Sequence, residues 1–200
     1  MKRNFRYAKT KVGEKSFNKI VRAGKILFAE SGYHSTSIND IIAKARVAVG
    51  TYYIYFNSKL ALYLYLLDEY QEKIRESARK AIKGLDSRKA IERAGLKAFI
   101  MYVIKEPLAY KLIWESLFVN EEIFVDYYSS FSKAYLENLE RYAKKGDIRN
   151  DIDLETVSFI LMGIANFVGL QILFKENPKE VDVDFVVDET MKLLDKGLFK

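Results

Sequence analysis

Hydroxyl groups and a glycine are concentrated in one short stretch of the chain, AVGTYYIY. Thr51, Tyr53 and Tyr55 carry hydroxyls that can hydrogen-bond phosphate oxygens or base edges. Gly50 has no side chain, so a ligand can come close to the backbone there. Lys59 follows with an ammonium group suited to phosphate. These residue types in this order predict binding to a polyanion.

The surrounding pattern predicts two short helices joined by a tight turn. The first is expected at residues 38–44, opened by the hydroxyl of Ser37, and the second at residues 48–56. Such a pair, with small and hydroxyl side chains on its second helix, is typical of a helix-turn-helix that docks in a major groove. We expect Tyr53 and Tyr55 to point outward. The residues predicted to contact DNA are Ser37, Asn39, Arg46, Ala48, Val49, Gly50, Thr51, Tyr53, Tyr55 and Lys59.

The stretch GYHSTSINDIIAKARVAVGTYYIYFNSKLALYLYL resembles the amino-terminal signature of the TetR family of transcriptional regulators. The resemblance rests on Gly32-Tyr33, Thr36, Asp40-Ile41, Ala45, Val47, Gly50-Thr51, Tyr53, Tyr55-Phe56 and Ser58-Lys59. It covers residues 32–66, about a sixth of the chain, and the rest is similar to the family only in length and in its helical pattern.

Three residues depart from the family pattern. Arg46 stands where glycine is usual in the turn, and a left-handed non-glycine residue there costs about 1 kcal/mol. Ala48 replaces a Ser or Thr cap of the second helix, a cap typically worth about 1 kcal/mol. Ile42 stands where a small alanine is usual between the two helices. These departures affect the placement of the second helix, while Arg46 could add a phosphate contact.

The positive charge is concentrated at the amino-terminal end. Residues 1–59 contain 12 Lys and Arg against 3 Asp and Glu, a net charge of +9. Residues 60–200 contain 21 against 24, a net charge of −3. Because phosphate contacts supply most non-specific affinity for DNA, this distribution indicates a polyanion partner for the amino-terminal end. The alternative is a solvated cationic face.

The composition argues against other functions. The chain has no cysteine, which excludes disulfides and suits a reducing cytosol. Its single histidine, His34, disfavours a histidine-based metal site or catalytic dyad, and we interpret it as a loop residue or a phosphate contact. The sequence has no Gly-x-Ser-x-Gly elbow, P-loop, dinucleotide fingerprint or metal-spaced cluster. We therefore expect no enzyme activity, cofactor or metal. No apolar run follows Met1, so a cytoplasmic location is expected.

Hydrophobic periodicity and the scarcity of proline predict an all-α protein of about nine helices. The expected helices are residues 14–30, 38–44, 48–56, 58–83, 87–105, 107–118, 121–145, 153–175 and 183–196. We expect a three-helix DNA-binding domain at residues 1–60 and an effector-binding and dimerisation bundle at residues 61–200. The helix from residue 58 belongs to both and is a natural lever between them.

Basic and aromatic residues alternate before the first helix. They are Lys2, Arg3, Phe5, Arg6, Tyr7, Lys9 and Lys11. An arm that follows phosphates or enters a minor groove and an unstructured tail remain equal alternatives for this segment.

Aromatic side chains are dense between residues 99 and 167, and core packing is the ordinary interpretation of most of them. A cavity lined by rings with a few polar groups is, however, the usual form of a small-molecule site. The family resemblance implies an apolar or aromatic effector held between these helices, oriented by Glu115 and Asn166. The predicted lining is Phe99, Tyr102, Trp114, Tyr128, Phe131, Phe159 and Asn166.

The last two helices are predicted to form a dimer face. Gly163, Ala165 and Gly169 would permit close approach. The apolar area would come from Ile172, Leu173, Val186, Val187, Leu193 and Leu194. The resemblance implies a four-helix bundle between two subunits, whose recognition helices enter major grooves about 34–36 Å apart on a palindromic operator.

One membrane alternative concerns residues 157–174, which carry no charge and approach the length of a spanning helix. Ser158, Asn166 and Gln171 favour burial in a bundle or a subunit interface instead.

The sequence therefore predicts a dimeric, sequence-specific DNA-binding transcriptional regulator, a repressor released by an apolar or aromatic effector. The alternative is an architectural DNA-binding protein of the same fold with a solid aromatic interior and no effector.

Overall fold

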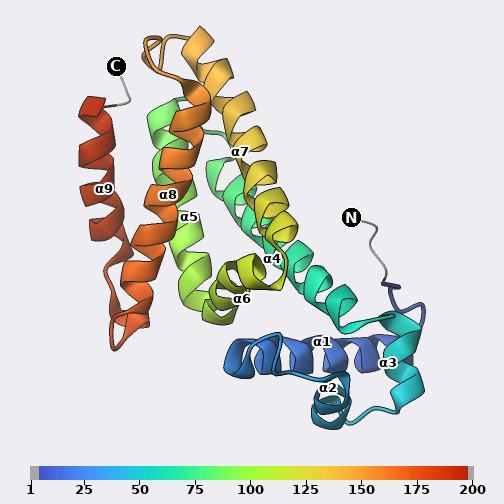
Figure 1. Ribbon diagram of the computed structural model, residues 1–200. Helices are drawn as coiled ribbons and strands as arrows, with labels where there is room; N and C mark the ends of the chain where they lie inside the picture. Colours follow the sequence, from blue (N-terminus) through green and yellow to red (C-terminus); the bar gives the residue numbers. More distant parts are fainter. Residues whose placement is uncertain (1–4, 198–200) are drawn as a thin grey trace. The chain divides into compact units, whose positions relative to one another are not determined.

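The structure, a computed structural model, describes residues 5–197 and is built from α-helices (Figure 1). In order these are α1 (Lys11–Ser31), α2 (Ile38–Ala45), α3 (Val49–Tyr55), α4 (Lys59–Ile82), α5 (Arg88–Lys105), α6 (Pro107–Val119), α7 (Glu121–Lys144), α8 (Leu154–Leu173) and α9 (Val183–Gly197). A 3₁₀ turn, Pro178–Glu180, precedes α9. The predicted all-α fold is confirmed, and the helix bounds agree with the expected ones to within a few residues.

Side-chain caps explain where several helices begin. Ser37 and Asp40 form a reciprocal capping box at the start of α2, since the Ser37 hydroxyl accepts the Asp40 N–H and the Asp40 carboxylate accepts the Ser37 N–H. These hydrogen bonds lower the pKa of Asp40. The Ser58 hydroxyl accepts the Ala61 N–H at the start of α4. Gly32 ends α1 with φ of 82°, a conformation that favours glycine.

The chain divides into two compact units. The first comprises the residues up to Glu72 together with Leu108–Phe124, and so includes α1, α2, α3, most of α4, and α6. Its core joins α1 to α4, because Gly24 lets Leu62 approach so closely that an added Cβ would lie 2.6 Å from the Leu62 Cδ2 atom. Helix α6 is anchored in this unit by the Tyr63 hydroxyl, which donates to the Leu112 carbonyl oxygen at 2.6 Å.

The first unit is larger than the predicted domain of residues 1–60. Leu62, Tyr63 and Leu66 of α4 are fully buried, and their burial keeps the first half of α4 with α1 rather than with the bundle. Helix α4 therefore contributes to both units, as the lever interpretation requires.

The second unit comprises Lys73–Pro107 and the residues from Val125 onward. One hydrophobic core joins α5, α7, α8 and α9, and its most buried residues include Ile100, Leu139, Ile148 and Val187. Arg88 and Glu92, one turn apart on α5, form a buried ion pair. Glu92 also accepts the Tyr135 hydroxyl at 3.0 Å. The charges of Arg88 and Glu92 are therefore paired inside the bundle, because a buried charge without a partner is costly.

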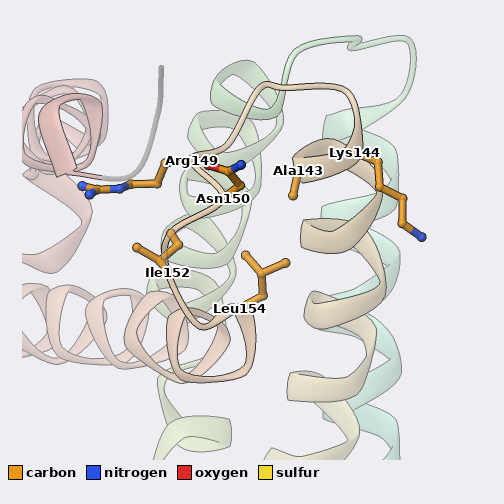
Figure 2. Close-up of a pocket in the computed structure, with 6 residues that line it drawn as sticks. All are labelled: Ala143, Lys144, Arg149, Asn150, Ile152 and Leu154. Carbon is orange, nitrogen blue, oxygen red and sulfur yellow. The ribbon is translucent and has the colours of Figure 1, made fainter.

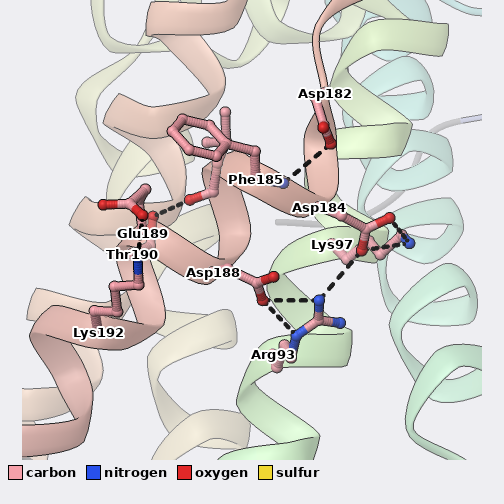
Figure 3. Close-up of polar contacts among 10 residues, drawn as sticks. Arg93, Lys97, Asp182, Asp184, Phe185, Asp188, Glu189, Thr190 and Lys192 are labelled. Atoms are coloured by element: carbon pink, nitrogen blue, oxygen red, sulfur yellow. Dashed lines mark hydrogen bonds and ion pairs between the residues drawn. The ribbon is translucent and has the colours of Figure 1, made fainter.

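Helix α9 is fixed to α5 by ion pairs along one edge (Figure 3). Arg93 binds Asp184 and Asp188, and Lys97 binds Asp184. These side chains are 40–53% exposed, so each pair contributes little by itself. They lie along the edge of α9 that faces α5, while Val187 and Leu194 of α9 are buried in the core.

The predicted capping defect of α3 can be tested by mutation. Ala48 occupies its N-cap with no side-chain hydrogen bond. We expect Ala48→Ser to raise the free energy of unfolding by about 1 kcal/mol, because a hydroxyl would accept a free N–H of the first turn. Thermal unfolding measures this. The matched control is Ser37→Ala, which removes an existing cap and should lower the melting temperature; an Ala48→Ser variant no more stable than the parent would contradict the assignment.

Candidate nucleic-acid interface

One face of α3 is exposed to solvent. Val49, Tyr53 and Ile54 are 56%, 52% and 60% exposed. Gly50 lies on the same surface, and a Cβ added there would meet no other atom within 4 Å. Packing inside the protein therefore does not require glycine at this position, which leaves the helix backbone open to a ligand. Thr51 is half-buried beside this face.

The opposite face of α3 is anchored in the core. Tyr52 and Phe56 are fully buried, and the Tyr52 hydroxyl donates to the Ser58 carbonyl oxygen at 3.2 Å. Burial raises the pKa of Tyr52. Tyr55 was expected to point outward, and that expectation is wrong. It is 8% exposed, its ring packs edge-on against Phe17, and its hydroxyl donates to the Gly13 carbonyl oxygen at 3.1 Å. The reason is that α1 covers this side of α3.

Lys59 is directed into the protein rather than toward the outer face of α3. Its ammonium donates to the carbonyl oxygens of Tyr33 and Thr36 at 2.6 and 2.7 Å, and lies 4.3 Å from the centre of the Tyr33 ring. Burial lowers the pKa of Lys59, while the nearby Glu115 carboxylate opposes that shift. Lys59, which was predicted to contact DNA, thus closes the loop between α1 and α2.

Glu115 holds the same loop from α6. Its Oε1 atom accepts the Tyr33 N–H at 2.5 Å and would clash with any Cβ at Gly32. Sequence reasoning placed Glu115 in the effector site, so this role was missed. No sequence signal could have shown it, because Tyr33 and Glu115 lie 82 positions apart. His34 is a loop residue, as expected, and its imidazole donates to the Phe118 carbonyl oxygen at 3.2 Å.

The remaining predicted contacts lie around the motif. Ser37 and Asn39 are exposed at the start of α2, although the Ser37 hydroxyl is already engaged with Asp40. Arg46 is exposed in the turn before α3 and is left-handed, with φ of 54°. This confirms the local conformation for which glycine would have been the easier residue. Ala48 is exposed.

The predicted effector residues are not all in one unit. Trp114 lies in the first unit and packs with Tyr110 and Phe124. Phe159 was expected to line a cavity, yet it is 48% exposed because α8 turns this face outward.

The other predicted effector residues lie in the second unit. The Tyr128 hydroxyl donates to the Asn166 side-chain oxygen at 3.4 Å, Phe99 packs on Gly169, and Tyr102 is buried. Phe131 lies under the guanidinium of Arg75, 4.9 Å from ring centre to Cζ.

A concavity of about 300 Å³ lies elsewhere in the second unit. Figure 2 shows its lining at the end of α7 and the loop that leads into α8. The residues around it are Ala143, Lys144, Arg149, Asn150, Ile152 and Leu154. None of the predicted effector residues lines it, and Arg149 is held by two hydrogen bonds to the Asp151 carboxylate.

A comparison with protein-family models finds a match within the first unit. Residues 20–66 match the family described as bacterial regulatory proteins, tetR family. These residues include the exposed face of α3 and the turn before it. Residues 20–66 belong to the tetR family of bacterial regulatory proteins.

Relatives extend this similarity. The chain is 29% identical over 99 residues to the HTH-type transcriptional activator FasR of Mycolicibacterium smegmatis, a match that covers 50% of this chain and 45% of FasR. The chain thus spans less than half the length of FasR. It is 22% identical over 156 residues to the HTH-type transcriptional regulator YdgC of Bacillus subtilis, covering 76% of this chain and 78% of YdgC.

Among solved structures, the fold is similar to that of the fatty acid degradation regulator FadR from Bacillus halodurans. The TM-score is 0.79 at 19% identity, and the match covers 96% of this chain and 98% of FadR. At this identity the similarity concerns the fold alone.

Two of the three tyrosines of α3, Tyr53 and Tyr55, allow DNA contact to be separated from packing. We expect Tyr53→Phe to weaken binding to duplex DNA about tenfold or more, because a hydrogen bond to a charged phosphate is worth about 1.5–3 kcal/mol. Its stability should stay within about 0.5 kcal/mol of the parent. We expect Tyr55→Phe to do the reverse, with stability lower by about 1 kcal/mol and affinity retained. Fluorescence anisotropy and thermal unfolding measure the two effects; equal affinity loss in both variants would refute this division.

Proposed function

We propose that this chain is a dimeric, sequence-specific DNA-binding regulator of transcription, a repressor that an apolar or aromatic small molecule releases from its operator. The observation that carries the proposal is the outer face of α3. There Val49, Gly50 and Tyr53 are presented to solvent from a rigidly anchored helix. Their surroundings are strongly positive, because residues 1–59 have a net charge of +9.

The shape of this face suits a major groove. Val49 offers a small apolar surface for a thymine methyl group, and Tyr53 offers a hydroxyl for a phosphate or a base edge. Gly50 lets the DNA approach the start of α3 without steric conflict. Arg46, exposed in the preceding turn, adds a charge for a phosphate. The base contacts determine sequence preference and the phosphate contacts determine position.

The proposed effector remains an apolar or aromatic molecule bound in the second unit. The rings of Phe99, Tyr102 and Phe131 offer an apolar lining, and the Tyr128–Asn166 pair offers polar groups. FadR, whose fold this chain shares, is named as a fatty acid degradation regulator, which favours an apolar effector. FasR is named as an activator, so the sign of regulation needs a direct measurement.

The proposed dimer face lies on α8 and α9, and its residues differ in part from those predicted, with Leu193 common to both sets. Gly169 packs on Phe99 and Val103 of α5, and Ile172, Val187 and Leu194 are buried within the unit. The exposed apolar residues on these two helices are Phe159, Ile160, Phe167, Phe174, Phe185 and Leu193. Because ion pairs hold one edge of α9 to α5, Phe185 and Leu193 fall on a different side of the helix.

A second subunit is the occupant that we propose for this face. Among the described residues, Leu154–Leu173 of α8 is the helix that is long and apolar enough to cross a membrane, and 28% of its most apolar window is buried within the chain. A helix with such an exposed apolar side is also what a subunit interface produces. Burial of several phenylalanine side chains against a symmetry mate would supply much of the association energy.

The dimer proposal predicts that charge on this face separates the subunits. Ile160→Glu combined with Phe185→Glu should give a monomeric mass by light scattering at micromolar concentration, because two carboxylates would be buried without partners. The matched control is Val125→Glu on α7, whose side chain is also about half exposed and should leave the dimer intact. A monomeric parent protein would overturn the proposal.

The function itself is tested by selecting duplexes from a random library with the parent protein. We expect enrichment of a palindrome whose half-sites lie about 34–36 Å apart, as two recognition helices require. Replacement of Val49 by Ser should change the preferred base at one position of each half-site. Enrichment of no sequence, with uniform affinity for all duplexes, would favour an architectural DNA-binding protein instead.

The selected duplex then serves to test release. A panel of fatty acids and aromatic compounds should contain members that raise the melting temperature of the protein and displace the duplex, because ligand binding stabilises the state it prefers. Transcription from a promoter bearing the selected sequence gives the sign of regulation. A panel that shifts neither measurement would remove the effector from the proposal.

A further inference from the structure

The segment before α1 is ordered against the end of the recognition helix. Phe5 forms an isolated antiparallel bridge with Phe56, and the Arg6 N–H donates to the Tyr55 carbonyl oxygen at 2.9 Å. Tyr55 is the last residue of α3. Figure 1 shows the chain at this point running beside the junction of α3 and α4.

Aromatic contacts fix this segment from both sides. The Phe5 ring lies edge-on to Tyr65 with centroids 5.1 Å apart, and edge-on to Tyr7 at 5.4 Å. Tyr7 in turn packs against Phe17 of α1 and Tyr65 of α4. Burial raises the pKa of Tyr65 to about 12. Of the two alternatives for the basic segment, the unstructured tail is therefore wrong for Phe5 through Tyr7.

The docked segment carries charge that the protein does not neutralise. Arg6, Lys9 and Lys11 are exposed, and within residues 5–197 none of them forms an ion pair. Lys2 and Arg3 lie outside the described residues. The segment thus presents three cations at the end of the helix whose outer face is proposed to enter the groove.

We propose that Arg6, Lys9 and Lys11 form a second DNA-contacting element, which binds phosphates of the strand beside the groove that α3 occupies. This inference rests on the proposed DNA-binding function. It adds residues outside the family match, which begins at residue 20.

The dimensions permit this contact. A helix of the length of α3, Val49–Tyr55, extends for about 10 Å. The major groove is about 12 Å wide. A segment hydrogen-bonded to the last residue of α3 therefore lies beside the groove that α3 is proposed to occupy, close to the phosphates that border it.

The contact is expected with phosphates rather than bases. The backbone of Arg6 is held at the end of α3 and the ring of Phe5 is turned into the aromatic cluster, so the segment follows the protein surface. Phosphate contacts of this kind strengthen binding to every sequence and increase its salt dependence.

The experiment compares two triple variants that remove the same charge. In the first, Arg6→Gln, Lys9→Gln and Lys11→Gln neutralise the proposed element. In the control, Lys83→Gln, Lys105→Gln and Lys133→Gln neutralise three exposed lysines of the second unit. Affinity for the selected duplex and for an unrelated duplex is measured between about 50 and 200 mM salt, the range over which phosphate contacts show their effect.

We expect the first variant to bind both duplexes more weakly, with a slope of log affinity against log salt smaller by up to about 2.7. The control should keep nearly the parent slope, and thermal unfolding should show that both variants are folded. A first variant with the parent slope would overturn the inference. A changed base preference with an unchanged slope would overturn the assignment to phosphates.

A third variant tests docking without changing charge. Phe5→Ala removes the ring that contacts Tyr65 and Tyr7, and should weaken binding several-fold at a temperature where the protein stays folded. Parent affinity in this variant would show that docking does not position the cations, contrary to the inference. If the parent protein itself binds no duplex at low salt, the proposed function fails; if the parent binds and the first triple variant binds equally, this inference alone fails.

Discussion

Helix α3 comprises only Val49–Tyr55, and a helix of two turns is unstable in water without tertiary contacts. Its position therefore depends on the side chains that anchor it, Tyr52, Tyr55 and Phe56. The hydroxyls of the two tyrosines are satisfied by carbonyl oxygens of Ser58 and Gly13. These contacts fix the rotation of α3 about its axis, and that rotation determines which residues face solvent. The exposed face with Gly50 and Tyr53 follows from the buried one.

The loop between α1 and α2 is held by a comparable set of polar contacts. Lys59 donates to the carbonyl oxygens of Tyr33 and Thr36, and Glu115 accepts the Tyr33 N–H. The two charged groups come from α4 and α6, which are far apart in sequence. Both helices continue into, or adjoin, segments of the second unit. Movement of either helix by the proposed effector would therefore act on the loop that precedes the helix-turn-helix, which is the physical meaning of the lever interpretation.

Most of the secondary structure could be predicted because its signals are local. The Ser37 and Ser58 caps, the glycine at the end of α1 and the apolar periodicity all act within a few residues, and the Ser37 cap is found where it was expected. The rotation of a helix in its environment is not a local property. Tyr55 was assigned outward and Lys59 was assigned to phosphate, because spacing alone did not show that α1 covers Tyr55 and that the Tyr33 loop binds Lys59. The same cause explains Phe159, whose helix presents it to solvent.

The sequence by itself determined an all-α chain and a basic amino-terminal helix-turn-helix that resembles the tetR family. Helix periodicity, caps and charge depend on residues that are close together in the sequence. Only the tertiary structure decided which hydroxyls of α3 are free, where Glu115 acts, and that Phe5 and Arg6 dock on α3 and its end. Those outcomes depend on contacts between residues distant in the chain, whose geometry arises when the helices pack.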